Sequence, residues 1–288
     1  MEYAVEIENL RKEFKGFTLK DVSFRIPKGY VMGLIGPNGA GKTTLIKMIM
    51  NLIRKNSGRI FVFGKDHIQH EAEIKSQIGF VYDVPCFYED LKLKKLASAI
   101  APFYPKWNQE LFLKLMNEFE LPLGKKFKKL SHGMKMKFSL CLALSHDAYL
   151  ILMDEPTSGL DPVFRQELLA QLSQIMLDEE KTVLFSTHIT SDLERIADYI
   201  TFINNGEILF SSTLDDILGK WGIIKAGKDL LEKKDIPGIM RSQKTEYGIE
   251  ILTSNIKKAQ TILPPDSITE KASLEDIMYF MSKGDKHA

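Results

Sequence analysis

The sequence predicts an α/β protein built on a parallel sheet, with a small domain after it. Two continuous apolar runs, YLILM (149–153) and TVLFS (182–186), are typical of parallel strands that are buried on both faces. A third strand, YVMGLIG (30–36), is followed at once by a helical pattern, as in strand–helix units. Because the pattern weakens after about residue 215, we expect a main domain at 1–215 and an accessory domain at 216–288.

Turn residues and apolar spacing define the elements of the first half. Two strands, 3–10 and 17–26, are predicted before the first parallel strand, and turn residues follow each of them. A helix is predicted over 41–58, where Gly58 acts as the stop signal. The apolar residues of this helix fall on one side: Leu45, Ile46, Ile49, Leu52 and Ile53.

The second half is predicted to be helical first and mixed later. Residues 86–146 have a mainly helical pattern, which three prolines interrupt. Two short apolar runs flank Asn204-Asn205-Gly206 and predict a β-hairpin. From Ser273 to Met281 we expect a capped amphipathic helix that packs against the rest of the chain. Its apolar face consists of Leu274, Ile277, Met278 and Met281.

Composition excludes several classes of protein. The 39 basic and 38 acidic residues give a net charge of +1, so we expect no nucleic-acid partner held by bulk charge. No apolar run reaches the roughly 18–20 residues that span a bilayer, and the N-terminus does not resemble a signal peptide. Cys86 and Cys141 have no metal-type spacing, and Cys141 is expected to be buried. These features predict a cytoplasmic protein.

The stretch GPNGAGKTT (36–44) predicts a nucleotide-binding loop. It fits the pattern G-x-x-x-x-G-K-[ST] and lies between a predicted strand and a predicted helix. Its glycines let backbone amides face phosphates, Lys42 supplies a cation, and the Thr43 hydroxyl reaches Mg²⁺. An ordinary glycine-rich turn is the alternative. The residues expected to hold the nucleotide are Gly36, Asn38, Gly39, Ala40, Gly41, Lys42, Thr43 and Thr44.

Three polar side chains end the two buried strands. Asp154 and Glu155 follow YLILM, and His188 follows TVLFS. In open parallel sheets the carboxyl ends of the strands form the ligand-binding edge, so we expect these side chains to meet there. Asp154 can hold Mg²⁺ through water, while Glu155 can polarise an attacking water molecule. Taken alone, the two acids could simply form a turn at the end of a strand.

Together these motifs resemble those of nucleotide-binding subunits of the ATP-binding cassette (ABC) transporter family. GPNGAGKTT matches the Walker A loop, YLILMDEP the Walker B strand, SGLD the D-loop and STH the switch histidine. LSHGMK (130–135) stands where the family carries its LSGGQ signature. The resemblance covers residues 1 to about 215 and implies a P-loop NTPase with the ABC ATPase fold. That fold has a RecA-like core, an antiparallel β subdomain and a helical subdomain, here at about 84–145.

The same resemblance implies cofactors and roles. ATP and Mg²⁺ are the expected cofactors, Glu155 the catalytic base, and His188 a contact of the γ-phosphate. Phe14 takes the place of the aromatic residue that stacks on adenine, although it could instead pack on the core. Two subunits would pair head to tail, each closing over the ATP of the other. The residues expected to reach the partner's ATP are Ser131, His132, Gly133 and Asp161.

Three positions depart from the family pattern. His132 and Met134 replace the usual Gly and Gln of the signature, so that His132 adds a titratable ring. The Q-loop glutamine of the family falls on Asp83. This carboxylate could ligate Mg²⁺, through water or directly, or it could only cap the following turn.

The implied function is ATP-driven export. Within the family the sequence looks most like bacterial exporters of antimicrobial peptides and drugs, whose membrane-spanning permease would be a separate chain. We therefore expect a protein bound peripherally to the inner face of the cell membrane, paired with a second nucleotide-binding subunit. A soluble ABC-type ATPase of DNA repair or translation is the alternative. A P-loop kinase or GTPase would leave LSHGMK and STH without a role.

Overall fold

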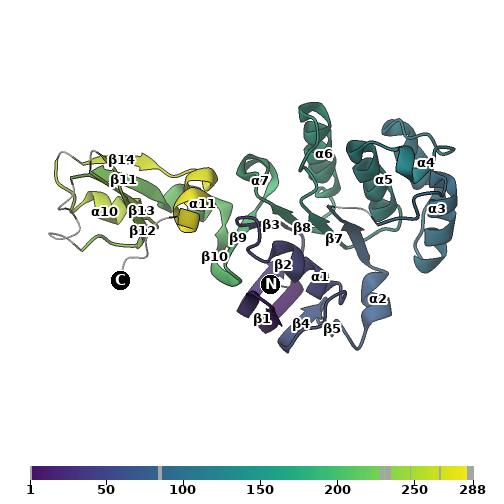
Figure 1. The fold of residues 1–288 in the computed structure, drawn as a ribbon, viewed down its shortest axis with the longest axis horizontal. Coiled ribbons are helices and arrows are strands. Elements are labelled where there is room, and N and C mark those ends of the chain that lie inside the picture. The colour runs from purple at the N-terminus through teal and green to yellow at the C-terminus, as the bar shows by residue number, and fades with distance from the viewer. Residues whose placement is uncertain are drawn as a thin grey trace.

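The fold is described from a computed structural model, in which residues 2–83, 86–227, 230, 235–246, 248–265 and 267–283 are placed. The predicted boundaries at residues 1, 84 and 288 lie outside these described residues. Figure 1 shows an elongated molecule, with residues 222–271 at one end and the helices of residues 93–144 at the other.

A six-stranded sheet forms the centre of the molecule. Its order is β10-β9-β3-β8-β7-β6, and all neighbouring pairs are parallel except the β9–β10 hairpin. Every residue of β3, β7 and β8 is buried, which confirms the predicted strands covered on both faces. The strand bounds are β3 Val31–Ile35, β6 Ile78–Val81, β7 Leu150–Asp154, β8 Thr182–Thr187, β9 Tyr199–Asn204 and β10 Glu207–Thr213.

Alternate residues of the central strands face two different cores, because side chains in a strand point to opposite faces in turn. On one face, Leu34 of β3 packs in a cluster with Leu45 and with Ile7 of the N-terminal sheet. On the other face, Ile35 belongs to a larger cluster with Phe138. The sheet is therefore the middle layer of the fold.

The N-terminal sheet is antiparallel, with the order β2-β1-β4-β5. It contains both strands predicted for the N-terminal segment and confirms the antiparallel β subdomain. The strands β4 and β5, which follow the first helix, were not predicted from the sequence. The bounds are β1 Tyr3–Phe14, β2 Phe17–Pro27, β4 Ser57–Val62 and β5 Lys65–Asp66.

Helices cover the sheet and form one end of the molecule (Figure 1). The mainly helical pattern predicted for 86–146 is confirmed in its described residues, where three α-helices and two 3₁₀ turns occur. These elements are α3 Leu93–Ile100, η1 Ala101–Phe103, α4 Gln109–Glu118, η2 Phe127–Lys129 and α5 His132–Leu144. The other helices before residue 221 are α1 Lys42–Ile49, α2 Glu71–Lys75, α6 Pro162–Ile175, α7 Thr190–Ile196 and α8 Leu214–Lys220.

The helix predicted over 41–58 is wrong in its second half, because α1 ends at Ile49. Asn51 has a φ of +52°, the left-handed conformation in which Asn and Gly commonly end helices. The Asn51 amide donates to the Met48 carbonyl and the Leu52 amide to the Lys47 carbonyl, which is the Schellman pattern. Leu52 is consequently 56% exposed instead of lying on an apolar helix face.

The C-terminal region forms a third sheet, which sequence analysis did not predict. Its order is β12-β13-β11-β14, and all pairs are antiparallel. The predicted final helix is confirmed as α11, although Phe280 also belongs to its buried face. The division at residue 215 stays a prediction, because one core cluster joins Trp221, Leu252 and Ile277 to the central sheet. The bounds are β11 Gly222–Ala226, β12 Ile239–Lys244, β13 Ile249–Thr253, α10 Ile256–Gln260, β14 Ile268–Lys271 and α11 Leu274–Lys283.

Candidate nucleotide-binding and hydrolysis site

The loop between β3 and α1 is curled against the β9–β10 hairpin. A Cβ atom on Gly36 would lie 2.1 Å from the carbonyl oxygen of Ile203, so only glycine allows this close approach. Gly41 has a φ of +115°, and its missing side chain makes room for Leu19. A hydrogen bond of 3.1 Å from the Gly206 amide to the Ala40 carbonyl fixes the loop. The backbone is thus held where its amides and the start of α1 favour an anion.

Lys42, the first residue of α1, is only 5% exposed. Its ammonium donates to the Gly36 carbonyl at 2.8 Å and forms an ion pair of 3.1 Å with the Glu155 carboxylate. A buried cation at the mouth of the loop is the group that a phosphate requires. The sequence-based role of Lys42 is therefore consistent with its position.

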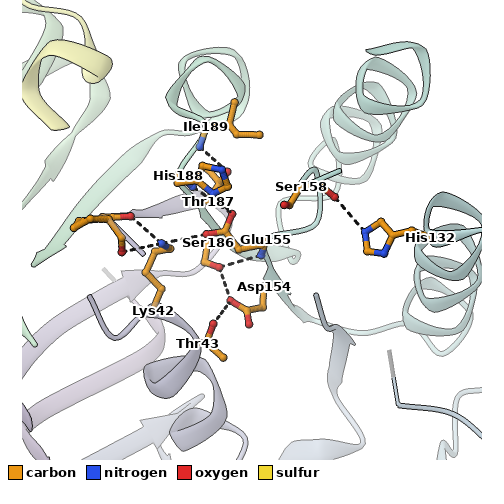
Figure 2. A network of polar contacts seen from close by, with 12 residues as sticks. Lys42, Thr43, His132, Asp154, Glu155, Ser158, Ser186, Thr187, His188 and Ile189 are labelled. Carbon is orange, nitrogen blue, oxygen red and sulfur yellow. Dashed lines mark hydrogen bonds and ion pairs between the residues drawn. The ribbon is translucent and has the colours of Figure 1, made fainter. Parts of the chain in front are cut away.

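Asp154 is buried at the end of β7 and is held by two hydroxyl groups (Figure 2). Ser186 donates to its Oδ1 at 2.7 Å and Thr43 donates to the same atom at 3.1 Å. Burial raises the pKa of the Asp154 carboxyl, and the neighbouring charges of Glu155 and Asp83 add to this effect. Its Oδ2 atom is buried without a hydrogen-bond partner among the described residues. A buried, unsatisfied carboxylate oxygen beside a hydroxyl fits a hard cation such as Mg²⁺.

Glu155 adopts a left-handed backbone conformation, with a φ of +48°, and its carboxylate faces His188. The His188 Nδ1 atom lies 2.8 Å from Glu155 Oε2, and the His188 backbone amide donates to the same oxygen at 3.3 Å. An ionised carboxylate only accepts hydrogen bonds, so the proton of this contact belongs to Nδ1. Figure 2 shows Glu155 between Lys42 and His188. The carboxylate is therefore fixed from two sides.

A cavity of about 610 Å³ opens beside these groups. It brings Asp83 to the same space as Thr43 and Glu155, which favours the metal-site alternative for Asp83; its role stays a prediction. Its lining consists of Gly16, Phe17, Asn38, Gly39, Ala40, Gly41, Lys42, Thr43, Thr44, Asp83 and Glu155. Every predicted nucleotide-binding residue except Gly36 and Phe14 is in this set, and Gly36 accepts from Lys42.

Phe14 is placed differently from a core residue. It is 42% exposed at the end of β1, and the Lys12 ammonium lies 5.3 Å from its ring centre. Its ring lies 6.3 Å from that of Phe17, which does line the cavity. The core-packing alternative is therefore disfavoured. Phe17 was not predicted as a site residue; its place directly after the Lys15-Gly16 turn is the one sequence signal that could have indicated it.

The residues expected to reach a partner's ATP lie on other elements. Ser131 is the N-cap of α5 and accepts a hydrogen bond of 3.3 Å from the Met134 amide. The His132 ring contacts the Ser158 carbonyl at 3.2 Å, to the side of the Lys42–Glu155 group (Figure 2). Asp161 caps α6 by accepting from the backbone amides of residues 163 and 164. Ser131 and His132 are exposed, and none of these residues lines the cavity described above.

Two negative findings complete the site. Within the described ranges no three His, Cys, Asp or Glu side chains gather as a self-sufficient metal site. This agrees with magnesium sites that use one or two carboxylates together with substrate phosphates. Among the described helices, none has the length and apolar character needed to cross a membrane.

A glycine-rich loop with a buried lysine that faces two carboxylates at the end of a parallel strand is typical of proteins that bind and hydrolyse nucleotides. The family model described as ABC transporter matches residues 19–158. The chain belongs to the family of ABC transporter ATP-binding proteins, as the similarity to known members shows. It is an ATP-binding and ATP-hydrolysing subunit of an ABC transporter.

Three relatives support the assignment to this family. The ABC transporter ATP-binding protein YtrB of Bacillus subtilis is 31% identical over 276 residues, 93% of this chain and 89% of the relative. The lantibiotic transport ATP-binding protein SrtF of Streptococcus pyogenes is 34% identical, over 73% of this chain and 91% of its own. The bacitracin transport ATP-binding protein BcrA of Enterococcus faecalis is 31% identical, over 75% and 71%.

Solved structures agree with the fold. An ATP-binding subunit of an ABC transporter superposes with a TM-score of 0.67 at 29% identity, covering 74% of this chain and 91% of that one. The dimeric cassette MJ0796 with ADP and phosphate gives a TM-score of 0.65 at 22% identity, over 73% and 98%, which shows the fold alone. The predicted fold class is thereby confirmed.

Proposed function

We propose that this subunit powers the export of a peptide or drug-like molecule through a separate membrane permease. Two of the three relatives described above are named for lantibiotic and bacitracin transport, which supports this substrate class. The alternative of a soluble ATPase in DNA repair or translation has no support among the three relatives described above, which are all named as ATP-binding proteins of transporters or transport. The observation that carries the catalytic part is the Lys42–Glu155–His188 arrangement beside the phosphate loop.

In the proposed mechanism, the loop amides and Lys42 bind the β- and γ-phosphates, and Phe14 stacks on the adenine. Thr43 and Asp154 would hold Mg²⁺, with Asp83 as a further ligand; the ion would neutralise charge on the phosphates. Glu155 accepts the proton of the attacking water, which is general base catalysis. His188, bonded to Glu155 through Nδ1, contacts the γ-phosphate.

The ATP site is completed by a second subunit in this proposal. The cavity beside the phosphate loop is lined by none of the residues expected to reach a partner's ATP, which are Ser131, His132, Gly133 and Asp161. A Cβ atom on Gly133 would meet neighbouring side chains only at 3.7 Å or more, so packing within the chain does not require glycine there. Gly133 instead leaves the start of α5 open to a phosphate from another copy.

A second cavity suits the permease. It has a volume of about 470 Å³ and lies between α1, β6 and the helices α3 and α5. The occupant that we propose is an amphipathic cytoplasmic helix of the permease, which would hold the subunit against the inner face of the membrane. Apolar and aromatic side chains dominate the lining, among them Met50, Leu52, Phe80, Phe87, Ile100 and Leu142.

Co-purification tests the transporter proposal. A tagged chain expressed in its own host should retain an integral membrane protein in mild detergent. Leu52→Arg puts a charge into the apolar groove at a position that is already 56% exposed, so it should release that protein and leave nucleotide binding intact. Leu113→Arg, at a 43% exposed leucine of α4 outside the groove lining, is the matched control. A chain that brings down no membrane protein, or releases it equally in both variants, would contradict the proposal.

A further inference from the structure

The last helix, α11, belongs to the C-terminal region but packs against the elements that carry the ATP site. Leu274, Ile277, Phe280 and Met281 are buried in the same cluster as Leu193 of α7 and Phe202 of β9. Ser273 starts the helix with a capping box: its hydroxyl accepts from the Asp276 amide, and the Asp276 carboxylate accepts from the Ser273 amide. The helix is therefore well defined and docked.

The start of α11 is bonded to the helix that follows His188. The Leu274 amide, one of the amides that a helix leaves without an internal partner, donates to Glu194 Oε1 at 3.0 Å. Glu194 lies on α7, which begins two residues after His188. The position of α7, and with it that of His188, is thus tied to α11.

The end of α11 is bonded to the hairpin behind the phosphate loop. Asn204 donates from Nδ2 to the Met281 carbonyl at 3.0 Å, a carbonyl in the last turn of the helix. On either side of Asn204, Ile203 packs against Gly36 and the Gly206 amide holds the Ala40 carbonyl. The hairpin that fixes the phosphate loop is thus tied to α11 as well.

The same helix faces the site directly. A hollow of about 290 Å³ is lined by four α11 residues together with Pro37 and Asn38 of the phosphate loop and by His188. Figure 2 shows part of the C-terminal region, in yellow, on the His188 side of the site. The helix α11 is thus hydrogen-bonded to α7, which follows His188, and to the hairpin that holds the phosphate loop.

We propose that α11 is a clamp that sets the position of His188 relative to the phosphate loop, with Glu194 and Asn204 as positioning residues. The C-terminal region would then control the rate of ATP hydrolysis without touching the nucleotide. The inference rests on the proposed contact of His188 with the γ-phosphate.

Single substitutions in the full-length chain test the clamp. Glu194→Ala removes the acceptor for Leu274, and Asn204→Asp replaces the donor amide by a carboxylate of the same shape. Each should lower kcat roughly tenfold, less than the about 10²-fold that a 1 Å misplacement can cost. The KM for ATP and the Kd for a non-hydrolysable ATP analogue should change by less than about twofold, because the Gly206–Ala40 hydrogen bond still holds the phosphate loop against the hairpin.

Matched controls separate positioning from general damage. Glu194→Gln keeps an oxygen that accepts from Leu274, so its kcat should stay near that of the unmodified protein. Arg195→Ala changes an exposed neighbour on α7 and should also be neutral. The double variant should lose little more than either single one, because releasing one end already frees the clamp.

Several outcomes would overturn the clamp. One is an unchanged kcat in both Glu194→Ala and Asn204→Asp, even if their thermal stability falls. Another is a loss of nucleotide binding in proportion to activity, which would mean that the residues act on the fold. A fully active His188→Ala variant would remove the proposed role of His188, and the clamp would have nothing to position.

Discussion

Glu155 lies between the Lys42 ammonium and the His188 imidazole. A substitution that removes its charge but keeps its shape tests which of the two properties matters. Glu155→Gln keeps the side-chain size but cannot accept a proton from water. We expect hydrolysis to fall about 10²–10⁴-fold, the usual contribution of general base catalysis, while ATP binding remains. Steady-state ATPase rates and binding of a fluorescent ATP analogue measure the two effects. A Glu155→Gln chain that hydrolyses ATP at the unmodified rate would assign the base elsewhere.

Asp154 shows how function and stability oppose one another at a single residue. A carboxyl whose pKa is raised by folding favours the folded state at low pH, and this contribution is lost as the pH rises through the raised pKa. At neutral pH, Asp154→Asn should therefore raise Tm by roughly 2–4 °C, the shift that about 1 kcal/mol produces in a large domain. Its amide oxygen still accepts from Ser186 and Thr43. Differential scanning fluorimetry should show the gain at pH 7 and a smaller one near pH 4.

The same substitution should abolish magnesium-dependent ATP hydrolysis, because a neutral amide is a poor ligand for a hard cation. A variant that is both less stable and fully active would contradict the proposed role of Asp154 as a buried metal ligand. Asp147→Asn, at a surface carboxyl bonded to Lys106 and Lys181, is a useful comparison. The pKa of Asp147 is lowered mainly by the hydrogen bond from Lys181, so neutralising it should have the opposite effect on stability.

His146 makes stability sensitive to mild acid. Burial lowers the pKa of its ring, which stacks on Tyr104 at 3.8 Å between ring centres. The unfolded chain therefore takes up the proton first as the pH falls below about 6.5, and the folded state loses stability there. One such proton corresponds to at most about 1.4 kcal/mol per pH unit. Urea unfolding at pH 7.5 and 5.5 should show that the free energy of unfolding depends less on pH in His146→Gln than in the unmodified chain. An equal dependence would show that His146 is not the source of the acid sensitivity.

Most of the candidate catalytic groups could be predicted from the sequence, because their spacing along the chain matches known motifs and their strands end at one edge of the sheet. Lys42 and Asp154 lie far apart in the sequence, but Lys42 comes shortly after β3 and Asp154 ends β7, and the carboxyl ends of these parallel strands meet at one edge of the sheet. Phe17 and Glu194 belong to no motif, and Asn204 was predicted only as part of a hairpin turn; their contacts depend on how distant elements pack. The local sequence does not reveal these contacts.

At the scale of elements, the start of α5 combines a structural and a proposed functional role in Ser131. Ser131→Ala removes the N-cap acceptor and should cost about 1 kcal/mol of stability. Ser131→Asp keeps an acceptor at the N-terminus of the helix and should not lower Tm, but its charge repels a phosphate. We expect ATP-dependent dimerisation to be weakened in Ser131→Ala and lost in Ser131→Asp. Thermal unfolding and light scattering with MgATP measure the two.

Mixing variants tests whether Ser131 acts on a partner. Lys42→Ala spoils its own phosphate loop but offers an intact α5 to a Ser131→Asp chain, so a mixed dimer keeps one complete site. Partial recovery of ATP-dependent dimerisation in the mixture is the expected result. A Ser131→Asp chain that cannot bind ATP alone would place Ser131 in its own site instead.

Element boundaries were predicted less well than element types. The pattern of apolar residues continues past Ile49, but the helix ends there. Asn51 adopts the left-handed conformation that ends the helix, and this preference outweighs the apolar periodicity. The C-terminal strands were missed because they are short and only partly alternating, as in β12, where no residue is fully buried. Such strands are defined by their partners in the sheet, which local sequence does not reveal.

At the scale of the whole molecule, the two regions share a core although they form separate sheets. A chain ending near Leu218 would lack Leu274, Ile277 and Phe280 and would expose the apolar surface that they cover. Burial of one such side chain contributes roughly 1.5–3 kcal/mol. We expect this truncated chain to bind ATP, as an accessory domain implies, but with a clearly lower Tm and increased binding of a hydrophobic dye. Complete loss of folding would show that residues 216–288 are part of the main domain.

The ion pair between Lys42 and Glu155 has a consequence for the order of events. The Lys42 ammonium is paired with the Glu155 carboxylate, and it is also the cation that would bind the γ-phosphate. A γ-phosphate bound by Lys42 would share the ammonium with Glu155, which would weaken the ion pair and leave the carboxylate freer to accept a proton. Binding of ATP would therefore free the base that is needed for its own hydrolysis.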